Sequence, residues 1–339
     1  MSYYSQSNSL DSQQVDSVPT RVQAITLGDR IYRLDRLLDQ VSDEIFTAAT
    51  SYEIQRAVDQ LFNGLRSLRR EASRDEWKQL IDRGRNHSLC QIVHEDPFTS
   101  RAFNKPRGYA GDAVMMDYIY SHDGDSSVPE ASPIGQAIFR YTTSAPASAG
   151  VRERRCHVAG LLDKLGAASP GRDVLAIACG HLREANLSSE VHLEKFGRFL
   201  ALDADPESLD EVGARYGRFG IKPIQADVRR MLTGRTDLGS FDLIYSTGLY
   251  DYLNDSIARR LTTNLFRDLR PGGRLVVANF LPEIRDVGYM EMFMDWHLVY
   301  RSRSDMLALA EAIDESELKQ IRIQSEANQN IIFLELTKR

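Results

Sequence analysis

The sequence predicts an α/β fold in which a doubly wound, mostly parallel sheet follows an α-helical N-terminal module. Three observations predict it. DVLAIACGHLRE, residues 173–184, begins as a short apolar strand and breaks into a turn at Cys179-Gly180, which is typical of a buried parallel strand that ends beside a ligand. FLALDAD, residues 199–205, is a second strand with an acidic end. The third observation is the helical spacing of apolar residues between positions 27 and 71.

The acidic end of the second strand predicts a nucleoside site. In a βαβ unit, a carboxylate at the tip of the second strand is positioned to hold the two ribose hydroxyls. IQADVRRML then places Asp227 just after a third short apolar strand, where its carboxylate could accept a hydrogen bond from an adenine amino group. A nucleoside cofactor therefore fits the ends of the first three strands.

The following segments continue the alternation of strands and helices. FDLIYSTGLYDYL contains a strand at 241–245 and a loop at 246–252 whose polar and aromatic side chains could face a substrate. A helix at about 256–269 leads to a turn at 270–273 and to an apolar strand at 274–280. IRIQSE, an Asn-Gln-Asn turn and IIFLELTK then predict an antiparallel edge hairpin.

Helices are predicted in the N-terminal part of the chain. Apolar residues at three- and four-residue spacing predict two amphipathic helices between positions 27 and 71. Ser73 and Glu76 have the spacing of a capping box, which predicts a further helix that runs to Leu89.

The length of 339 residues favours a catalytic domain with an added module over one compact core. Residues 1–20 have the Ser, Gln and Asp content of a disordered leader. We expect an α-helical lid module at 21–150 and the catalytic domain at 151–339. A lid over the cleft would exclude water from the reacting centre.

Together these segments resemble the class I S-adenosylmethionine-dependent methyltransferases over roughly residues 150 to 339. The resemblance implies a seven-stranded, Rossmann-like sheet and S-adenosylmethionine as the cofactor. It also implies that the cofactor is bound by residues of four strand ends, namely Ala178, Cys179, Gly180, Asp203, Ala204, Asp227, Val228, Thr247 and Gly248. The chain departs from the family pattern after Gly180, where His181, Leu182 and Arg183 stand in place of further glycines.

A second segment narrows the resemblance. KPRGYAGD, residues 105–112, resembles the signature of a bacterial subgroup of these enzymes that acts in extracellular-factor and hydroxy fatty acid methyl ester biosynthesis. Azetidine-2-carboxylate synthases are similar to the same subgroup. GYMEMFMDWHLVYRS, residues 288–302, looks like a second signature of it. Within the first signature, Arg107 could pair with the cofactor carboxylate, and Asp112 could hold its ammonium or orient a tyrosine hydroxyl.

The candidate catalytic residues follow from the charge of the cofactor, a sulfonium cation that aromatic faces attract by about 0.5–2 kcal/mol each. The candidate aromatic residues are Tyr109, Tyr118, Tyr250, Tyr252 and Trp296. Tyr118 also fits an amphipathic helix, and Trp296 also fits a core. His181 could act as a base or could cap the following helix. The predicted catalytic set is Tyr109, Asp112, Tyr250 and His181.

Composition excludes several other classes of site. A net charge of −6 argues against a nucleic-acid enzyme and favours small-molecule substrates. The absence of a long apolar run and the polar N-terminus argue against a membrane span and predict a cytoplasmic protein. The cysteines and histidines lack metal-ligand spacing, so no metal is expected. The basic cluster 152–155 is interpreted as a solvated helical face.

Three functions fit these features. The first is methyl transfer to a small-molecule carboxylate or hydroxyl, in bacterial specialised metabolism. The second is cyclisation of S-adenosylmethionine itself to azetidine-2-carboxylate, with release of 5'-methylthioadenosine. The third is non-catalytic cofactor binding, which the polar loop after the fourth strand disfavours. Methyl transfer needs an open acceptor cavity, and cyclisation needs that space filled. The sequence leaves this choice open, as it does the oligomeric state.

Overall fold

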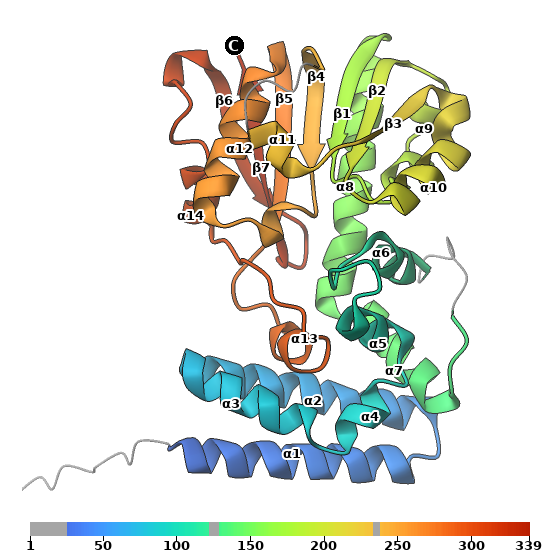
Figure 1. The fold of residues 1–339 in the computed structure, drawn as a ribbon, viewed down its shortest axis with the longest axis vertical. Coiled ribbons are helices and arrows are strands. Elements are labelled where there is room, and N and C mark those ends of the chain that lie inside the picture. Colours follow the sequence, from blue (N-terminus) through green and yellow to red (C-terminus); the bar gives the residue numbers. More distant parts are fainter. Residues whose placement is uncertain (1–25, 122–128, 233–237) are drawn as a thin grey trace, which may run out of the picture.

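The computed structural model describes residues 26–121, 129–232 and 238–339. Figure 1 shows a sheet with helices on both faces and a layer of helices beyond one end of it. The predicted leader at 1–20 lies outside the described residues. Within them, no helix is long and apolar enough to cross a membrane.

Seven strands of the described chain form one sheet in the order β3-β2-β1-β4-β5-β7-β6. The first five pair in parallel, and β7 pairs antiparallel with both β5 and β6. This confirms the predicted fold class, including the hairpin that closes the sheet. The strands are β1 (Arg172–Ile177), β2 (Phe196–Asp203), β3 (Ile221–Gln225), β4 (Phe241–Ser246), β5 (Leu269–Phe280), β6 (Leu318–Ser325) and β7 (Ile331–Lys338).

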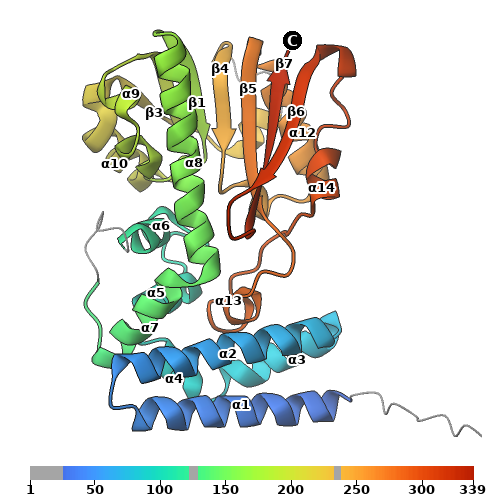
Figure 2. The same ribbon diagram turned by 180° about the vertical axis from the view of Figure 1, so that it is seen from behind.

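Helices cover both faces of the sheet, which explains why residues 174–177 of β1 and 243–245 of β4 are buried and apolar in succession rather than alternating with polar residues. In β1, Val174 and Ala176 face the core beneath α8, whereas Leu175 and Ile177 face the core beneath α12. Figure 2 shows α8 lying along the face opposite α12. The helices of this part are α8 (Pro146–Ala168), α9 (Ser189–His192), α10 (Pro206–Tyr216), α11 (Val228–Leu232), α12 (Asp255–Arg267), α13 (Val287–Phe293) and α14 (Arg303–Ala308). Short 3-10 turns are η2 (Arg183–Asn186), η3 (Gly217–Phe219), η4 (Tyr250–Tyr252) and η5 (Glu315–Glu317).

The N-terminal helices lie beyond the carboxyl ends of the parallel strands, where α13 packs against α2 (Figures 1 and 2). Their buried side chains belong to the same hydrophobic cluster as one face of the sheet. The two parts of the chain therefore share a core. The helices are α1 (Leu27–Thr47), α2 (Ser51–Glu71), α3 (Arg74–Arg85), α4 (Leu89–Val93), α5 (Pro97–Asn104), α6 (Ala113–Tyr120) and α7 (Pro133–Ser144).

Two predicted boundaries are wrong. The capping box of Ser73 and Glu76 is present, but α3 ends at Arg85 rather than running to Leu89. The predicted turn at 270–273 lies inside β5 as an irregularity of the ladder, because Phe241 pairs with Leu269 while Leu243 pairs with Arg274. Gly272 has a φ of +78°, which only glycine adopts without strain.

Candidate active site

The main cavity opens at the carboxyl ends of the parallel strands, beside the point where the strand order changes direction between β1 and β4. Its volume is about 380 Å³, within the range that holds a cofactor-sized ligand. Its walls come from the loops after the first four strands, from α8, and from residues 280, 296 and 298. The N-terminal part contributes residues of the GYAGD segment, residues 108–112. Segments far apart in the sequence therefore meet here.

The turn after β1 and the acid at the end of β2 are joined directly. Ala178 and Gly180 both have a φ of +51°, so the chain reverses sharply at the end of the strand. The Gly180 N–H donates to Asp203 Oδ2 at 2.8 Å, and the Asp205 N–H donates to Oδ1 at 3.0 Å. Burial raises the pKa of Asp203 above its ordinary value. Cys179, like these residues, lines the cavity.

The ends of β2 and β3 supply an apolar stretch of wall. Ala204, Ala226 and Val228 line the cavity, but Asp227 does not. The Asp227 side chain is exposed. The predicted adenine site is therefore apolar in its walls, and Asp227 lies at its edge.

The loop after β4 is fixed by a buried arginine that the sequence placed on the surface. Arg154 of α8 is only 7% exposed, lines the cavity and donates from Nη1 to the carbonyl of Thr247. Its neighbour Arg155 is also buried, with its guanidinium carbon 4.2 Å from the centre of the Tyr120 ring. The prediction of a solvated face is therefore wrong for both. Thr247 and Gly248 line the cavity as expected.

Tyr250, which was predicted to be catalytic, does not line the cavity. Its side chain is fully buried outside the cavity, and its hydroxyl lies 3.0 Å from Oγ1 of Thr262 in α12. Because η4 turns the backbone at each step, the next two side chains, Asp251 and Tyr252, face the cavity instead.

An aromatic wall, defined here as Tyr109, Tyr252 and Trp296, closes one side of the cavity. The rings of Tyr109 and Tyr252 are 6.5 Å apart at 78°, and Trp296 Nε1 donates to the Tyr252 hydroxyl at 2.8 Å. Gly111 permits this packing, because a Cβ there would lie 2.4 Å from the Tyr252 hydroxyl oxygen. Burial raises the pKa of both tyrosines, so both hydroxyls stay protonated at neutral pH. Tyr118 is not part of the wall and packs against Phe139.

Asp112 does not face the cavity, contrary to the catalytic role predicted for it. It is fully buried and accepts the Met115 N–H at 2.9 Å as the N-cap of α6. Arg101 donates to both carboxylate oxygens from Nε and Nη2, at 3.0 Å and 2.8 Å. The carboxylate fixes the GYAGD segment onto α5 and α6 instead of meeting a ligand.

We therefore expect Asp112→Ala to lower the free energy of unfolding by about 2–4 kcal/mol, since it removes a helix cap and leaves Arg101 without its charge partner. Chemical denaturation measures this loss. Cofactor affinity per folded molecule should change little. A variant with unchanged stability and lost turnover would contradict this structural assignment.

Arg107 is paired within the protein rather than directed at a cofactor carboxylate. Its Nη1 donates to Asp205 Oδ2 at 2.9 Å and to Ser208 Oγ at 3.2 Å, and its Nη2 donates to Glu207 at 2.9 Å. It does not line the cavity, although Asp205 does. Arg107 thus joins the KPRGYAGD segment to the start of α10.

His181 lines the cavity, but both of its ring nitrogens have neighbours. Nδ1 lies 2.8 Å from Asp117 Oδ2, and Nε2 lies 3.3 Å from Arg107 Nη1. Burial acts to raise the pKa of Asp117, but hydrogen bonds from Arg183 and His181 outweigh it and hold that pKa below its usual range. His181 is placed to hold α6 against the turn after β1.

Besides Asp205, two more carboxylates in the cavity wall, Asp251 and Glu184, were not among the predicted site residues. Asp251 is 3% exposed, and its Oδ1 accepts the Phe280 N–H at 2.7 Å. Burial raises the pKa of Asp251 to about 7. Glu184 accepts the Tyr245 hydroxyl at 2.8 Å, and burial also raises its pKa. Their position in the sequence could have identified Glu184 and Asp251, because each follows a strand that ends at the site.

Residues 174–273 match the model of a protein family described as methyltransferase domain. The match begins in β1 and ends within β5, so it covers the strands whose ends form the cavity. The chain has a class I methyltransferase fold. The match supports the predicted cofactor, S-adenosylmethionine.

Solved structures resemble the chain at low identity. A possible exported protein from Bordetella parapertussis has 17% identity and a TM-score of 0.54, over 91% of this chain and 96% of its own. The N-methyltransferase NodS from Bradyrhizobium japonicum, in complex with S-adenosyl-L-homocysteine, has 19% identity and a TM-score of 0.41, over 57% and 88%. Magnesium protoporphyrin IX methyltransferase ChlM from Synechocystis, with bound S-adenosylmethionine, has 11% identity and a TM-score of 0.45, over 71% and 97%. Among curated proteins, none matches the sequence.

No group of three or more His, Cys, Asp or Glu residues in the described part of the chain is arranged to hold a metal ion. Cys90, Cys156 and Cys179 form no disulfide bond.

Proposed function

We propose that this protein is an S-adenosylmethionine-dependent enzyme of bacterial specialised metabolism that transfers a methyl group to a small-molecule acceptor. The observation that carries the proposal is the cavity of about 380 Å³ that has a carboxylate at the end of β2 on one side and an aromatic wall on the other. A nucleoside cation needs both features. When bound, S-adenosylmethionine would supply the methyl group as a sulfonium electrophile.

The chemistry of the lining fits this cofactor. Asp203 offers carboxylate oxygens to ribose hydroxyls, and Ala204, Ala226 and Val228 offer apolar surface to adenine. The aromatic wall offers ring faces to a sulfonium, each worth about 0.5–2 kcal/mol when water is excluded. Arg154 supplies the cation that a methionine carboxylate requires.

The acceptor belongs on the side of β4 and β5, beyond the nucleoside site. Here Asp251 can take the proton that a hydroxyl loses as it forms a bond to the methyl carbon, while the bond from that carbon to sulfur breaks. A base with a pKa of about 7 suits this task at neutral pH. The wall and the GYAGD segment contribute by positioning the acceptor and excluding water. A carboxylate acceptor would need no base.

The test is to incubate the purified protein with S-adenosylmethionine and a panel of small carboxylates and alcohols. We expect S-adenosylhomocysteine to form in proportion to the methylated acceptor, both measured by mass spectrometry. Methylated product without S-adenosylhomocysteine would contradict the proposal. Calorimetry that detects no binding of S-adenosylmethionine or of S-adenosylhomocysteine would contradict it as well.

A second candidate is cyclisation of S-adenosylmethionine to azetidine-2-carboxylate, and one observation favours it. The space behind the aromatic wall is nearly filled, with a cavity of only about 20 Å³. Asp251 could then remove a proton from the amine as its nitrogen bonds to the methionine carbon next to sulfur, while the bond from that carbon to sulfur breaks and 5'-methylthioadenosine leaves.

The two reactions separate when no acceptor is supplied. We expect methyl transfer to leave S-adenosylmethionine intact in that assay, apart from the slow decay seen without enzyme. Enzyme-dependent 5'-methylthioadenosine together with a cyclic four-carbon amino acid would instead establish cyclisation.

A further inference from the structure

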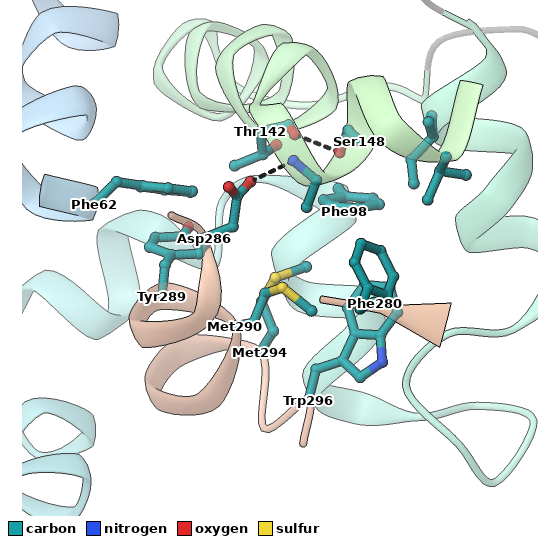
Figure 3. A pocket seen from close by; sticks show the side chains of 13 residues that line it. Phe62, Phe98, Thr142, Ser148, Phe280, Asp286, Tyr289, Met290, Met294 and Trp296 are labelled. Carbon is teal, nitrogen blue, oxygen red and sulfur yellow. Dashed lines mark hydrogen bonds between the residues drawn. The ribbon is translucent and has the colours of Figure 1, made fainter. Parts of the chain in front are cut away.

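A second, smaller cavity lies behind the aromatic wall, and its lining comes from α2, α5, α6, α7, α8, α13 and the end of β5. Figure 3 shows its lining, with Phe280 and Trp296 on one side and Asp286 above Met290 and Met294. Val151, Phe280 and Trp296 also border the main cavity. The small cavity is therefore the immediate neighbour of the proposed acceptor site. Its volume of about 20 Å³ admits about one water-sized group.

Most of the lining is apolar, but Asp286 is not. This residue is 3% exposed, and its Oδ1 accepts the Ala147 N–H at 3.2 Å in the first turn of α8. Oδ2 is buried without a hydrogen-bond partner. A helix N-terminus stabilises a carboxylate, which accounts for Oδ1. It does not account for an unpaired oxygen beside apolar side chains, because a buried polar atom left unpaired costs free energy.

Burial raises the pKa of Asp286 to about 6, while the hydrogen bond from the Ala147 N–H and the charges of Arg285 and Arg66 oppose the rise. This carboxyl group is therefore largely ionised at neutral pH. The neighbouring polar side chains have partners of their own, since Thr142 donates to Asp96 and Ser148 donates to the Thr142 carbonyl. Asp286 Oδ2 is thus the unsatisfied acceptor of this lining, and a carboxylate ligand would be repelled from it.

We propose that Asp286 binds an O–H or N–H group of the methyl acceptor, at the end of the molecule opposite the reacting group. The acceptor would then carry a hydroxyl or amino group on a short apolar body, with the body against Phe280 and Trp296. Met290 and Met294 have the unbranched, flexible side chains that can move to admit such a body. This assignment rests on the proposed function, because it takes the main cavity as the reaction site.

The test measures ligand binding rather than turnover. The full-length protein is saturated with S-adenosylhomocysteine and titrated with n-butylamine, 1-butanol or n-butyrate, which share an apolar body and differ in the end group. We expect the amine or the alcohol to bind at least tenfold more tightly than butyrate. Asp286→Asn, which keeps an oxygen for the Ala147 N–H, should remove that preference. The control Glu283→Gln alters an exposed acid near by and should retain it.

A second variant tests the cavity without changing the carboxylate. Val151→Ile adds one methylene group to a residue that borders the cavity, and we expect it to weaken binding of the preferred probe at least threefold. Equal binding of all three probes, no binding of any of them, or an unchanged preference in Asp286→Asn would overturn the assignment. Failure of S-adenosylhomocysteine to bind would refute the proposed function instead, so the two failures are distinguishable.

Discussion

Replacing Asp251 by asparagine should lower turnover of a hydroxyl acceptor by about 100-fold or more, the usual loss when a general base is removed. The change should leave cofactor affinity within a few-fold of its original value. Asparagine retains an oxygen that can accept the Phe280 N–H, so the local backbone can keep its geometry. Steady-state rates together with calorimetry of S-adenosylhomocysteine binding measure the two effects separately.

The pH dependence of the same variant gives a second measurement. Asp251 is active as a base when ionised, so the rate should rise with pH through about 7 in the original protein, and this limb should be lost in Asp251→Asn. The contribution of Asp251 to the free energy of unfolding changes with pH in the opposite direction. A carboxyl whose pKa is raised on folding stabilises the fold most below its unfolded pKa of about 3.9, and the benefit is lost as pH rises through about 7.

Asp96→Asn is the matched control for Asp251. Asp96 is also fully buried with a raised pKa, but it accepts hydrogen bonds from Thr99 and Thr142 and lies outside the cavity wall. We expect this variant to lose stability and keep the pH profile of turnover. If Asp251→Asn keeps the original turnover rate and the rise of that rate with pH, Asp251 is not the general base.

Asp203→Ala should weaken binding of S-adenosylhomocysteine by about 100-fold or more. Two hydrogen bonds from ribose hydroxyls to a carboxylate contribute roughly 1.5–3 kcal/mol each, and about 1.4 kcal/mol corresponds to a factor of ten. Part of the loss would come from the protein, because Asp203 also accepts the Gly180 and Asp205 N–H groups that shape the pocket. Calorimetry measures the affinity.

The control for Asp203 is Asp210→Ala, which removes an exposed acid from α10 and should leave affinity unchanged. Thermal denaturation of both variants separates loss of fold from loss of binding. Equal affinity of Asp203→Ala and the original protein would show that the ribose lies elsewhere.

The sheet could be predicted because its signals are local. The turn at Cys179-Gly180, the acid at Asp203 and the alternation in the hairpin each lie within one short segment, and parallel strands place their ends at one edge. Residues 178–180 and 247–248 were assigned to the site from the family resemblance, and the structure places them in one cavity with Asp203.

The errors occurred where the role of a side chain depends on a distant partner. Arg154 is buried because the Thr247 carbonyl accepts its hydrogen bond, and Asp112 is structural because Arg101 reaches it from α5. Tyr250 and Asp251 are adjacent in a 3-10 turn, so a single residue decides which one faces the ligand. Sequence spacing alone does not contain these facts.

Asp286 belongs to the same group of unpredicted residues. Nothing in the local sequence marks a carboxylate with one unpaired buried oxygen, because the cavity around it is built from six helices and the end of β5, which lie far apart in the sequence. Asp286 is a candidate binding residue because it is buried and because its Oδ2 lacks a hydrogen-bond partner, and both properties arise only when the chain is packed.

The most direct test of the central claim is a crystal structure of the protein with S-adenosylhomocysteine. We predict ribose hydroxyls on Asp203, adenine against Ala226 and Val228, and the sulfur atom facing Tyr109, Tyr252 and Trp296. Density for the ligand outside this cavity, or with the ribose away from Asp203, would contradict the site and the reaction proposed for it.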